Sequence, residues 1–489
     1  TKQANQTNQS NRGLCYTARM STPENWFQTG EKLVAVNQYG TPGFTEGLEL
    51  LKKSADADFT DAQVSLGHLY AQVHTLPDAA SESAHWYQRA AERGHPVAQD
   101  RLADLYMSGR GVPQNDAEAF RWYARTAAQA FPHALCNLAY MHDEGLGTPV
   151  DAGTATKMYL RAAASADPRG LFNLGLRYAA NQDSPQQFPA AHACLAMAAF
   201  ARYPLADELL ARLDARLDPA SREQAGVLAP RLRERLRAFQ QRLESDSALT
   251  DDPPALMRFA EDNLAALGEL SLNIANVRNI ARTAEPHQAD APSAISASPN
   301  IFTVDNFVSE SECAHLLALA AARLAPARET TRERLSGEQT AFTGEAAIFH
   351  TPDSDAVVRN IERRIAAVFS LPVTHVEPLS VLRYRADDRY APHVDYFDAA
   401  RLANNLRIGD RSGQRVASFL VYLRAPGAGG ETRYLKIGKK IAGRPRMALC
   451  HFNLTKAGTP DPMTLHTGEA VIEGEKWLAR TTLREKPFY

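Results

Sequence analysis

Two histidines and one aspartate in the second half of the chain could hold a metal ion. His393 and Asp395 stand two residues apart in YAPHVDYF, and His466 follows 71 residues after Asp395. Alternate residues of a β-strand point to the same face, so the imidazole and the carboxylate can converge on one ion. Two histidines and one carboxylate form the facial triad that binds non-haem Fe(II) and leaves positions open for a cosubstrate and O2. We therefore expect His393, Asp395 and His466 to bind iron.

A lysine at a fixed distance from this triad indicates which cosubstrate joins the iron. Lys476 follows ten residues after His466. A lysine that faces the interior of a barrel is a costly buried charge unless it meets an anion. The far carboxylate of 2-oxoglutarate, which chelates Fe(II) through its keto acid end, would be such an anion. The spacing predicts Fe(II), 2-oxoglutarate and O2 as cofactors.

The elements that must position these residues are predicted to be short strands. Apolar segments alternate with Gly and Pro turns after residue 300, namely VASFLVYL, RMALCHF, GEAVI and KWLARTTL. Residues 308–325 and 353–370 instead have the apolar spacing of amphipathic helices. This order predicts a β-rich domain over 301–489 with supporting helices.

Several motifs follow one another in this region in a characteristic order. They are FTVDNFVSESECAHLLALA, the H-x-D segment, G-G-E-T and HTGEAVIEGEKW. Together they resemble the catalytic domain of the prolyl 4-hydroxylase family of Fe(II)/2-oxoglutarate dioxygenases. The resemblance implies a double-stranded β-helix, a distorted jelly roll. It also implies hydroxylation of a C–H bond coupled to conversion of 2-oxoglutarate to succinate, with ascorbate as a candidate reductant. An aspartate at 395, rather than Gly or Ala, favours hydroxylation over halogenation.

The resemblance also assigns roles to residues around the triad. Lys476 would pair with the distal carboxylate of 2-oxoglutarate, assisted by the hydroxyls of Tyr384 and Thr432. Tyr422 would line the same pocket. Tyr390, three residues before His393, matches a tyrosine that faces the peptide substrate.

Three positions depart from the family pattern on the side of the substrate. The family usually has K-W-x-x-x-x-W-x-H, but Thr482 and Arg484 stand where Trp and His are usual, and Ala470 replaces a proline. We expect Thr482 and Arg484 to contact the substrate, with Arg484 pairing with an acidic group or replacing the histidine as a hydrogen-bond donor. A collagen-like substrate is not supported.

The first half of the chain contains an internal repeat with a period of 36 residues. Leucines recur at this spacing from Leu66 to Leu210, and small residues recur four positions earlier, from Ala62 to Ala206. A second set of positions, WY or MY followed by Ala, keeps the same step. The repeat resembles Sel1-like repeats of the tetratricopeptide type and implies an α-solenoid that binds proteins.

Composition and seams complete the expected organisation. At roughly 100–200 residues per domain, 489 residues predict two to four domains. We expect an N-terminal segment over 1–43 (1–19 a tag or upstream sequence before a start at Met20), a solenoid over 44–218, a helical connector over 219–282, a linker over 283–300 and the oxygenase domain over 301–489. The net charge of −2 and the lack of a long apolar run argue against nucleic-acid and membrane partners. Five scattered cysteines indicate free thiols in a cytoplasmic protein.

Three functions remain open. The favoured one is a dioxygenase that hydroxylates peptidyl proline in a protein recruited by the repeats. The second keeps the chemistry but acts on another residue, a free amino acid or a small natural product. The third is a non-catalytic repeat scaffold with a vestigial oxygenase domain.

Overall fold

The computed structural model describes residues 22–37, 39–73, 76, 78–129, 132–165, 167–180, 188–245, 287–327, 342–350, 354–407 and 412–488. The expected tag and the expected start at Met20 lie outside these residues. The part of the expected connector from 246 to 282 also lies outside them. Two compact units divide the chain between Gln114 and Asn115, inside the predicted solenoid, and each is described by itself.

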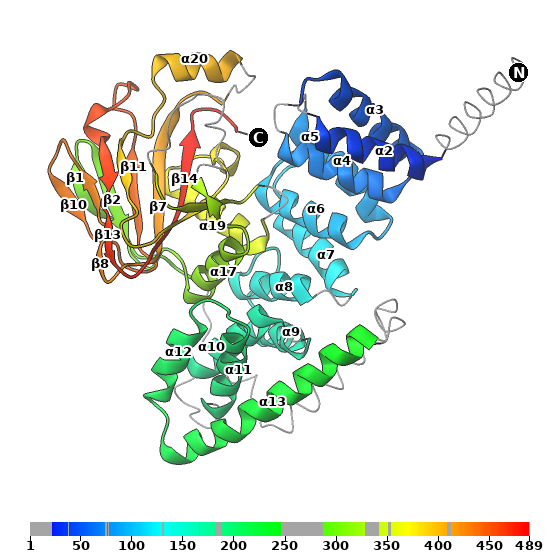
Figure 1. Cartoon of the computed structure of the whole chain (residues 1–489), viewed down its shortest axis with the longest axis vertical. Helices are drawn as coiled ribbons and strands as arrows, with labels where there is room; N and C mark the ends of the chain where they lie inside the picture. Colours follow the sequence, from blue (N-terminus) through cyan, green and yellow to red (C-terminus); the bar gives the residue numbers. More distant parts are fainter. Residues whose placement is uncertain are drawn as a thin grey trace, which may run out of the picture. The chain divides into compact units, whose positions relative to one another are not determined.

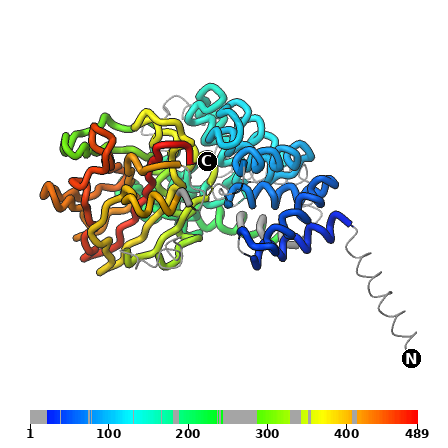
Figure 2. The backbone as a smooth tube through the Cα atoms, turned by 90° about the horizontal axis from the view of Figure 1, so that it is seen from above, coloured from blue at the N-terminus to red at the C-terminus, as the bar shows by residue number. Residues whose placement is uncertain are grey.

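The first unit consists of helices, each in contact with the next along the chain (Figures 1 and 2). They are α2 (Pro23–Val36), α3 (Pro42–Asp56), α4 (Thr60–Gln72), α5 (Ala79–Glu92) and α6 (Pro96–Ser108). The repeated positions fill the interior, since Ala62, Leu66, Tyr87 and Leu102 are fully buried. The small residues are required by close contacts, because a Cβ on Gly67 would lie 2.6 Å from the ring of Tyr87.

The second unit begins with further repeats of the same kind. Its helices are α7 (Asp116–Ala127), α8 (Pro132–Glu144), α9 (Ala152–Ala164), α10 (Pro168–Ala180), α11 (Phe188–Phe200), α12 (Ala206–Asp214) and α13 (Pro219–Ser245). Tyr123, Ala134, Leu174 and Ala206 are again buried at the predicted spacing. The predicted α-solenoid of helix pairs is confirmed.

Gly111 lies in the turn that follows α6, where its conformation and surroundings require glycine. It has φ +72°, and a Cβ there would lie 2.0 Å from the carbonyl oxygen of Ala80. Gly94 has a similar φ of +89°, but a Cβ on Gly94 would meet nothing within 4 Å. We expect Gly111→Ala to lower the free energy of unfolding by about 3 kcal/mol and Gly94→Ala to lower it by about 1 kcal/mol. Both substitutions strain the backbone, because alanine disfavours a positive φ, but only the Cβ at position 111 also clashes with backbone atoms. Equal losses of unfolding free energy in the two variants, measured by urea titration, would show that the close approach of Gly111 to Ala80 does not affect stability.

The described strands in the remainder of the second unit form two larger sheets and one two-stranded sheet (Figure 1). The described strands of the larger sheet have the order β1-β2-β11-β7-β14-β5-β4-β3, and those of the smaller sheet the order β10-β9-β12-β6. The pairings within both sheets are antiparallel. The larger sheet contains β1 (Ser293–Ala297), β2 (Asn300–Val304), β3 (Ala325–Pro326), β4 (Glu345–Ile348), β5 (Ser380–Tyr384), β7 (Arg415–Arg424), β11 (Ala448–Phe452) and β14 (Lys476–Arg484). The smaller contains β6 (Tyr390–His393), β9 (Thr432–Tyr434), β10 (Lys439–Ile441) and β12 (His466–Gly468), while β8 (Ala428–Gly429) pairs with β13 (Val471–Glu473).

The interior of this jelly roll joins residues of both sheets. Leu382, Leu449 and Leu478 of the larger sheet share one buried cluster with Tyr434 and Ile441 of the smaller sheet. Alternating side chains of each strand supply this cluster, as expected for a sandwich with one apolar face per sheet. The predicted jelly-roll fold is confirmed.

Two details of the predicted elements differ. The expected linker over 283–300 contains β1, which pairs with β2, because a Ser/Ala-rich segment satisfies its backbone groups at a sheet edge without apolar side chains. The expected strand over 468–472 is split between β12 and β13, which pair with different strands. The predicted helices are present as α17 (Glu310–Ala321) and α19 (Ala356–Val368); the structure also has the short helix α20 (Ala399–Arg407) and the 3-10 turns η4 (Val373–His375) and η5 (Pro462–Thr464).

Helices α17 and α19 connect the sheet to the repeats of the second unit. Helix α17 contacts β4, β5 and β7 on one side and α10 on the other, while α19 contacts α8 (Figure 1). Ala314 of α17 belongs to the same buried apolar cluster as α10 and α11. Helix α17 of the jelly roll therefore packs against the hydrophobic core of these repeats.

A buried polar group secures this junction. Glu312, 1% exposed, accepts hydrogen bonds from the hydroxyl of Tyr140 at 2.6 Å and from Arg364 at 2.8 Å. Asn360 donates to the hydroxyl oxygen of Tyr140 at 2.8 Å. Residues of α8, α17 and α19 are thus joined through one carboxylate.

A second carboxylate at the junction makes stability depend on pH. Burial, followed by repulsion from Glu312, raises the pKa of Glu144 to about 7, although Arg364 acts in the opposite direction. Between about pH 4.5 and 7 the folded protein keeps this proton while the unfolded chain releases it, so stability falls as pH rises through this range. We expect Glu144→Gln to be more stable than the wild type by about 2 kcal/mol at pH 8 and equal to it at pH 4.5.

Urea titrations at several pH values measure this difference. Glu223→Gln, on the exposed face of α13, is the matched control and should leave the pH profile unchanged. A constant difference between Glu144→Gln and the wild type from pH 4.5 to 8 would contradict the assignment.

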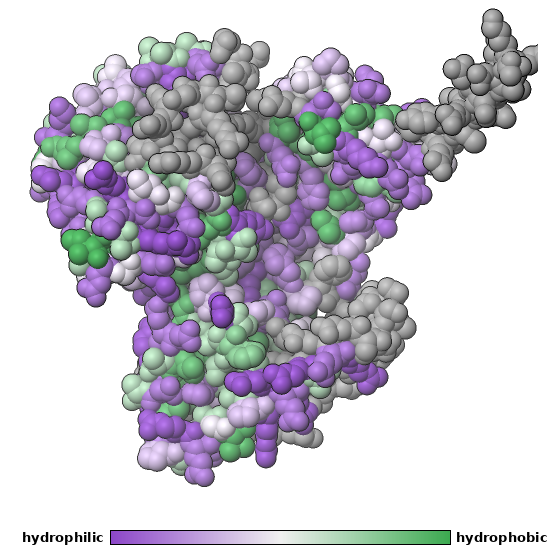
Figure 3. All heavy atoms as spheres, in the orientation of Figure 1, coloured by the Kyte–Doolittle hydropathy of each residue, from purple (hydrophilic) through white to green (hydrophobic). Residues whose placement is uncertain are grey.

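The surface and the cysteines agree with the composition. Hydrophilic residues prevail on the face drawn in Figure 3, where hydrophobic residues form small separate groups. The described helices include none that is both long and apolar enough to span a bilayer. Cys136, Cys194, Cys313 and Cys450 are buried free thiols, as predicted, while Cys15 lies outside the described residues.

Candidate active site

The three predicted metal ligands meet at the end of the smaller sheet. His393 is the last residue of β6 and pairs directly with His466, the first residue of β12. One potential ligand atom from each of His393, Asp395 and His466 lies within 4.8 Å of the others. The spacing predicted that Asp395 lies on the same strand as His393. Asp395 instead lies in the bend that follows this strand. The backbone turns there, and the carboxylate still lies 3.6 Å from Nε2 of His393.

Both imidazoles are oriented for metal binding. Nδ1 of His393 donates to the carbonyl of Ala391 at 2.8 Å, and Nδ1 of His466 donates to the carbonyl of Thr464 at 2.9 Å. A carbonyl can only accept, so each proton is on Nδ1 and each Nε2 keeps its lone pair. Burial lowers the pKa of His393 and lowers that of His466 to about 3. The rings are therefore neutral near pH 7, as a metal ligand requires.

The carboxylate of Asp395 is fixed by neighbours on β7 and β11. Ser418 donates to its Oδ2 at 2.6 Å, and Asn453 in turn donates to the hydroxyl of Ser418 at 3.0 Å. Burial by itself would raise the pKa of Asp395, but contact with His451 and the imidazoles of the site hold it well below the ordinary value. The carboxylate is thus ionised and has a defined orientation, as an oxygen ligand of a metal would need.

His451 belongs to this site although the sequence analysis did not select it. Its ring is fully buried, with Nδ1 2.8 Å from the hydroxyl of Tyr434 and Nε2 3.5 Å from Oδ2 of Asp395. Because a carboxylate only accepts, the proton belongs on Nε2, and Tyr434 donates to Nδ1. The available signal was a histidine at a buried position of the apolar segment MALCHF.

We expect His451→Phe to weaken metal binding about tenfold while the fold is kept. Phenylalanine preserves the ring volume but removes the N–H that faces Asp395, and loss of such supporting contacts costs about 10- to 100-fold in affinity. Titration with Mn(II) under anaerobic conditions measures the effect, with His85→Phe on the exposed face of α5 as the control. Equal affinities for wild type and His451→Phe would show that His451 only fills space.

Lys476 is buried in the same pocket without an acidic partner. It is 1% exposed, and its ammonium group donates to the carbonyl of Gly430 at 2.8 Å and lies 4.8 Å from the ring centre of Tyr384. Within the described part of the chain it forms no ion pair. Burial lowers its pKa to about 8, although Glu431 acts in the opposite direction. A buried cation of this kind is suited to a dianionic cosubstrate that arrives from solution.

The other predicted cosubstrate residues surround this lysine. Tyr384 pairs with Lys476 across β5 and β14. The hydroxyl of Tyr422 lies 2.7 Å from the hydroxyl of Thr432, and its ring centre lies 5.4 Å from the ammonium group. Tyr384, Thr432 and Lys476 line the pocket, as predicted, whereas Tyr422 is not among its lining residues and contacts Thr432 from behind.

One pocket contains the predicted metal ligands, Lys476 and part of the predicted substrate wall. Its lining comprises Leu382, Tyr384, Tyr390, His393, Asp395, Ser418, Phe419, Leu420, Thr432, His466, Gly468, Lys476, Leu478, Arg480, Thr481 and Thr482. Tyr390 stacks on His393 with ring centres 3.9 Å apart. The structure thus brings Tyr390 and Thr482 together with the triad, as predicted.

Arg484 lies elsewhere, and Arg480 lines the pocket instead. Arg484 is buried outside the lining, donates to Glu377 at 2.9 Å and lies over the ring of Phe397. The expectation of a substrate contact from Arg484 does not fit this placement. The family pattern marks only the positions of the missing Trp and His, so it does not indicate Arg480. The alternation of β14 from Lys476 was the signal that could have found it.

Comparisons with known proteins show which families this chain resembles. Residues 60–95, 96–131 and 132–167 each match the family model of the Sel1 repeat. Prolyl 4-hydroxylase 1 of Arabidopsis thaliana is 31% identical over 236 residues, which cover 44% of this chain and 81% of the relative. Probable prolyl 4-hydroxylase 4 of the same plant is 34% identical, with 38% of this chain and 67% of the relative covered. The viral collagen prolyl hydroxylase of Paramecium Bursaria Chlorella virus-1 in its 2OG complex is 23% identical and covers 38% of this chain and 95% of that chain, with a TM-score of 0.30.

The fold and the site define a 2-oxoglutarate-dependent dioxygenase that is preceded by Sel1 repeats. The chain belongs to the prolyl 4-hydroxylase family.

Proposed function

We propose that this chain hydroxylates peptidyl proline in a protein partner bound by the repeats, with Fe(II), 2-oxoglutarate and O2 as cofactors. The main support is that His393, Asp395, His466 and Lys476 line one pocket. A vestigial domain would have no need to keep a buried lysine beside an intact set of metal ligands, since such a lysine costs stability when it has no anion.

The residues of the pocket would have distinct roles in binding the metal and the cosubstrate. His393, Asp395 and His466 would hold Fe(II), which, with 2-oxoglutarate and O2 bound, supplies the oxidising chemistry that inserts oxygen into a C–H bond. Lys476 would bind the far carboxylate of 2-oxoglutarate, with Tyr384 and Thr432 as hydrogen-bond donors. Each role uses groups that the fold has already oriented and desolvated.

The remaining lining determines how the substrate approaches. Leu382, Leu420 and Leu478 belong to the larger sheet and face the pocket, where they exclude water from the reacting carbon. Tyr390 stacks on His393 and offers an aromatic face for a proline ring at the metal. Thr482, where the family usually has tryptophan, leaves more room there, which favours a substrate different from collagen.

Succinate formation tests the proposal. Full-length protein with Fe(II) and 2-oxoglutarate should form succinate faster when proline-containing peptides are added, and the peptide should gain the mass of one oxygen atom. Lys476→Met should raise the KM for 2-oxoglutarate about 100-fold, because the far carboxylate loses its ion pair in a desolvated site, while metal binding is retained. Absence of peptide-stimulated turnover, together with turnover of a free amino acid, would contradict the choice of peptidyl proline.

A further inference from the structure

We propose that Arg480 binds a carboxylate group of the substrate beside the carbon that is hydroxylated. The inference rests on the proposed function, because it assumes that the pocket is a dioxygenase site. It adds the chemical class of the substrate, which family membership leaves open: a proline or related residue next to a carboxylate.

Arg480 lies on the inward face of β14. Lys476, Leu478, Arg480 and Thr482 alternate along the strand and all line the pocket. Arg480 therefore projects between the cosubstrate lysine and the level of Thr482. A side chain at this position meets whatever enters the pocket beside the metal.

The guanidinium group of Arg480 has no acidic partner among the residues that the structure describes. It donates to the hydroxyl of Tyr390 at 3.3 Å, and its central carbon lies 5.6 Å from the centre of that ring. Asp395 contributes to the electrostatic field at Arg480, but within the described part of the chain the two residues form no ion pair. A guanidinium group has five N–H donors, so several remain for a bidentate contact with a carboxylate.

Neighbouring arginines of the same sheet show the usual arrangement. Arg415 forms a bidentate ion pair with Glu377, at 2.8 and 2.7 Å, and Arg484 donates to the same carboxylate. Arg383 is paired with Glu345. The arginine that faces the pocket is thus the one whose charge is left for a molecule from outside.

The cosubstrate does not account for this charge. Lys476 already provides the cation for the far carboxylate of 2-oxoglutarate, and the keto acid end of that molecule belongs at the metal. Arg480 contacts Tyr390, and Tyr390 stacks on His393 at 3.9 Å. Tyr390 therefore separates a carboxylate bound by Arg480 from the predicted metal ligand His393. Such a carboxylate would lie beside the substrate residue that is oxidised.

Two sources of a carboxylate fit this position. One is an Asp or Glu side chain adjacent to the target proline in a protein, and the other is the α-carboxylate of a C-terminal or free amino acid. Both are planar anions that a guanidinium group recognises in the same way. The proposed recruitment by the repeats favours the acidic side chain, and the experiment distinguishes the two.

The test compares peptides that differ in one charge. Equilibrium binding of fluorescent peptides to full-length protein loaded with Mn(II) and 2-oxoglutarate, without O2, is measured for Glu-Pro and Gln-Pro peptides and for peptides ending in proline as the free acid or the amide. We expect a preference of about 10- to 100-fold for one of the two acidic forms, because the contact is a charge-assisted pair in a desolvated site. The same ratio should appear in kcat/KM when O2 is admitted.

Variants then assign the preference to Arg480. Arg480→Gln should abolish the ratio between acidic and neutral peptides, and Arg480→Lys should keep part of it. The affinity for 2-oxoglutarate should remain unchanged in both variants, in contrast to Lys476→Met. Arg433→Gln, an exposed arginine on β9, is the control and should behave like the wild type.

The outcomes separate this inference from the proposed function. Equal binding of acidic and neutral forms by the wild type, or weaker 2-oxoglutarate binding in Arg480→Gln with an unchanged peptide ratio, would overturn the role of Arg480 even if proline is hydroxylated. Turnover of free amino acids alone, with the same dependence on Arg480, would support the carboxylate contact and contradict the peptidyl substrate.

Discussion

Replacing His466 with alanine is expected to abolish 2-oxoglutarate turnover and to weaken Fe(II) binding about 1,000-fold or more. The imidazole is 4% exposed, its Nδ1 is committed to the carbonyl of Thr464, and its pKa near 3 leaves Nε2 unprotonated. Removal of one of three ligands affects every step that needs the metal, so binding and turnover fall together.

Anaerobic metal titration and succinate assays measure the two effects. The loss should be much larger than that in His451→Phe, because His451 acts through Asp395 rather than on the metal itself. His85→Ala, on an exposed face of the repeats, should match the wild type. Full iron affinity and turnover in a folded His466→Ala protein would contradict the assignment and favour a site without a facial triad.

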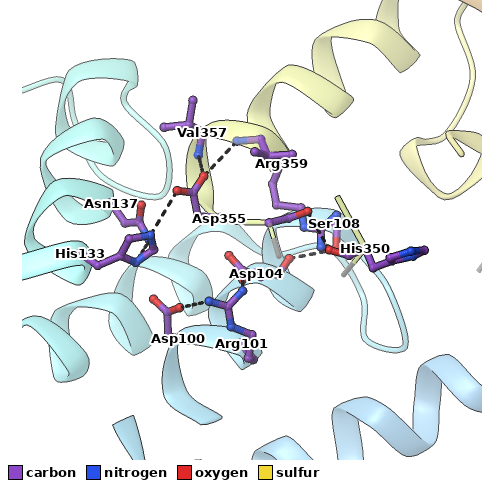
Figure 4. Close-up of polar contacts among 12 residues, drawn as sticks. Asp100, Arg101, Asp104, Ser108, His133, Asn137, His350, Asp355, Val357 and Arg359 are labelled. Atoms are coloured by element: carbon purple, nitrogen blue, oxygen red, sulfur yellow. Dashed lines mark hydrogen bonds and ion pairs between the residues drawn. The ribbon is translucent and has the colours of Figure 1, made fainter. Parts of the chain in front are cut away.

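Replacing Asp355 with alanine is expected to destabilise the second unit by about 3–5 kcal/mol. Asp355 is 1% exposed and begins α19 by accepting from the backbone N–H groups of Val357 and Val358 at 3.1 and 3.2 Å. Its carboxylate also lies 3.3 Å from Arg169 and 2.7 Å from His315, and Figure 4 shows His133 directed at it from α8. Loss of one partner from a buried ion pair leaves the other charge unpaired, which is the costly case.

The charge of Asp355 adds a pH dependence with a defined sign. Burial by itself would raise the pKa of Asp355, but the fields of His315 and Arg169 hold it well below the ordinary value. A carboxyl with a lowered pKa contributes stability above its unfolded pKa, near 3.8, and loses that contribution as pH falls towards the folded pKa. The difference in unfolding free energy between Asp355→Ala and the wild type should therefore be largest near pH 6 and should decrease in strong acid.

Asp151→Ala is the matched control for this prediction. Asp151 begins α9 in the same way, by accepting from the backbone N–H of Thr154 at 2.9 Å, but it is exposed. Loss of such a cap alone costs about 1 kcal/mol. Similar losses in the two variants, measured by urea unfolding at pH 6, would show that Asp355 acts only as a cap and that the contact with the repeats adds nothing.

The junction also changes how the repeats can be understood. A solenoid that only delivers a substrate would need no more than a flexible linker to the enzyme. Here Tyr140 and Arg169, on repeat helices, reach buried carboxylates on the helices that support the sheet. The repeats of the second unit are therefore part of the scaffold that supports the jelly roll.

The sequence by itself determined the repeat and the candidate metal ligands. His393, Asp395, His466 and Lys476 could be identified because chemistry limits which residue types bind Fe(II) and a carboxylate, although Asp395 lies in a bend and not on the strand that its spacing suggested. The repeat positions could be identified because close helix contacts admit only small residues at Ala62 and its equivalents, so the same constraint recurs every 36 residues. Local periodicity and residue type carry this information along the chain.

Only the tertiary structure decided which other residues join the site. His451 faces Asp395, and Arg480 rather than Arg484 lines the pocket, because β11, β7 and β14 are adjacent in the folded sheet and each register determines which side chain points inward. Asp355 and Glu312 likewise resemble ordinary helix-capping residues in sequence, and they become junction residues only when α8 and α10 pack beside them. Some of these contacts join positions more than 100 residues apart, such as Tyr140 and Glu312 at a separation of 172. No local pattern records them, since their energy depends on burial and on partners that the fold supplies.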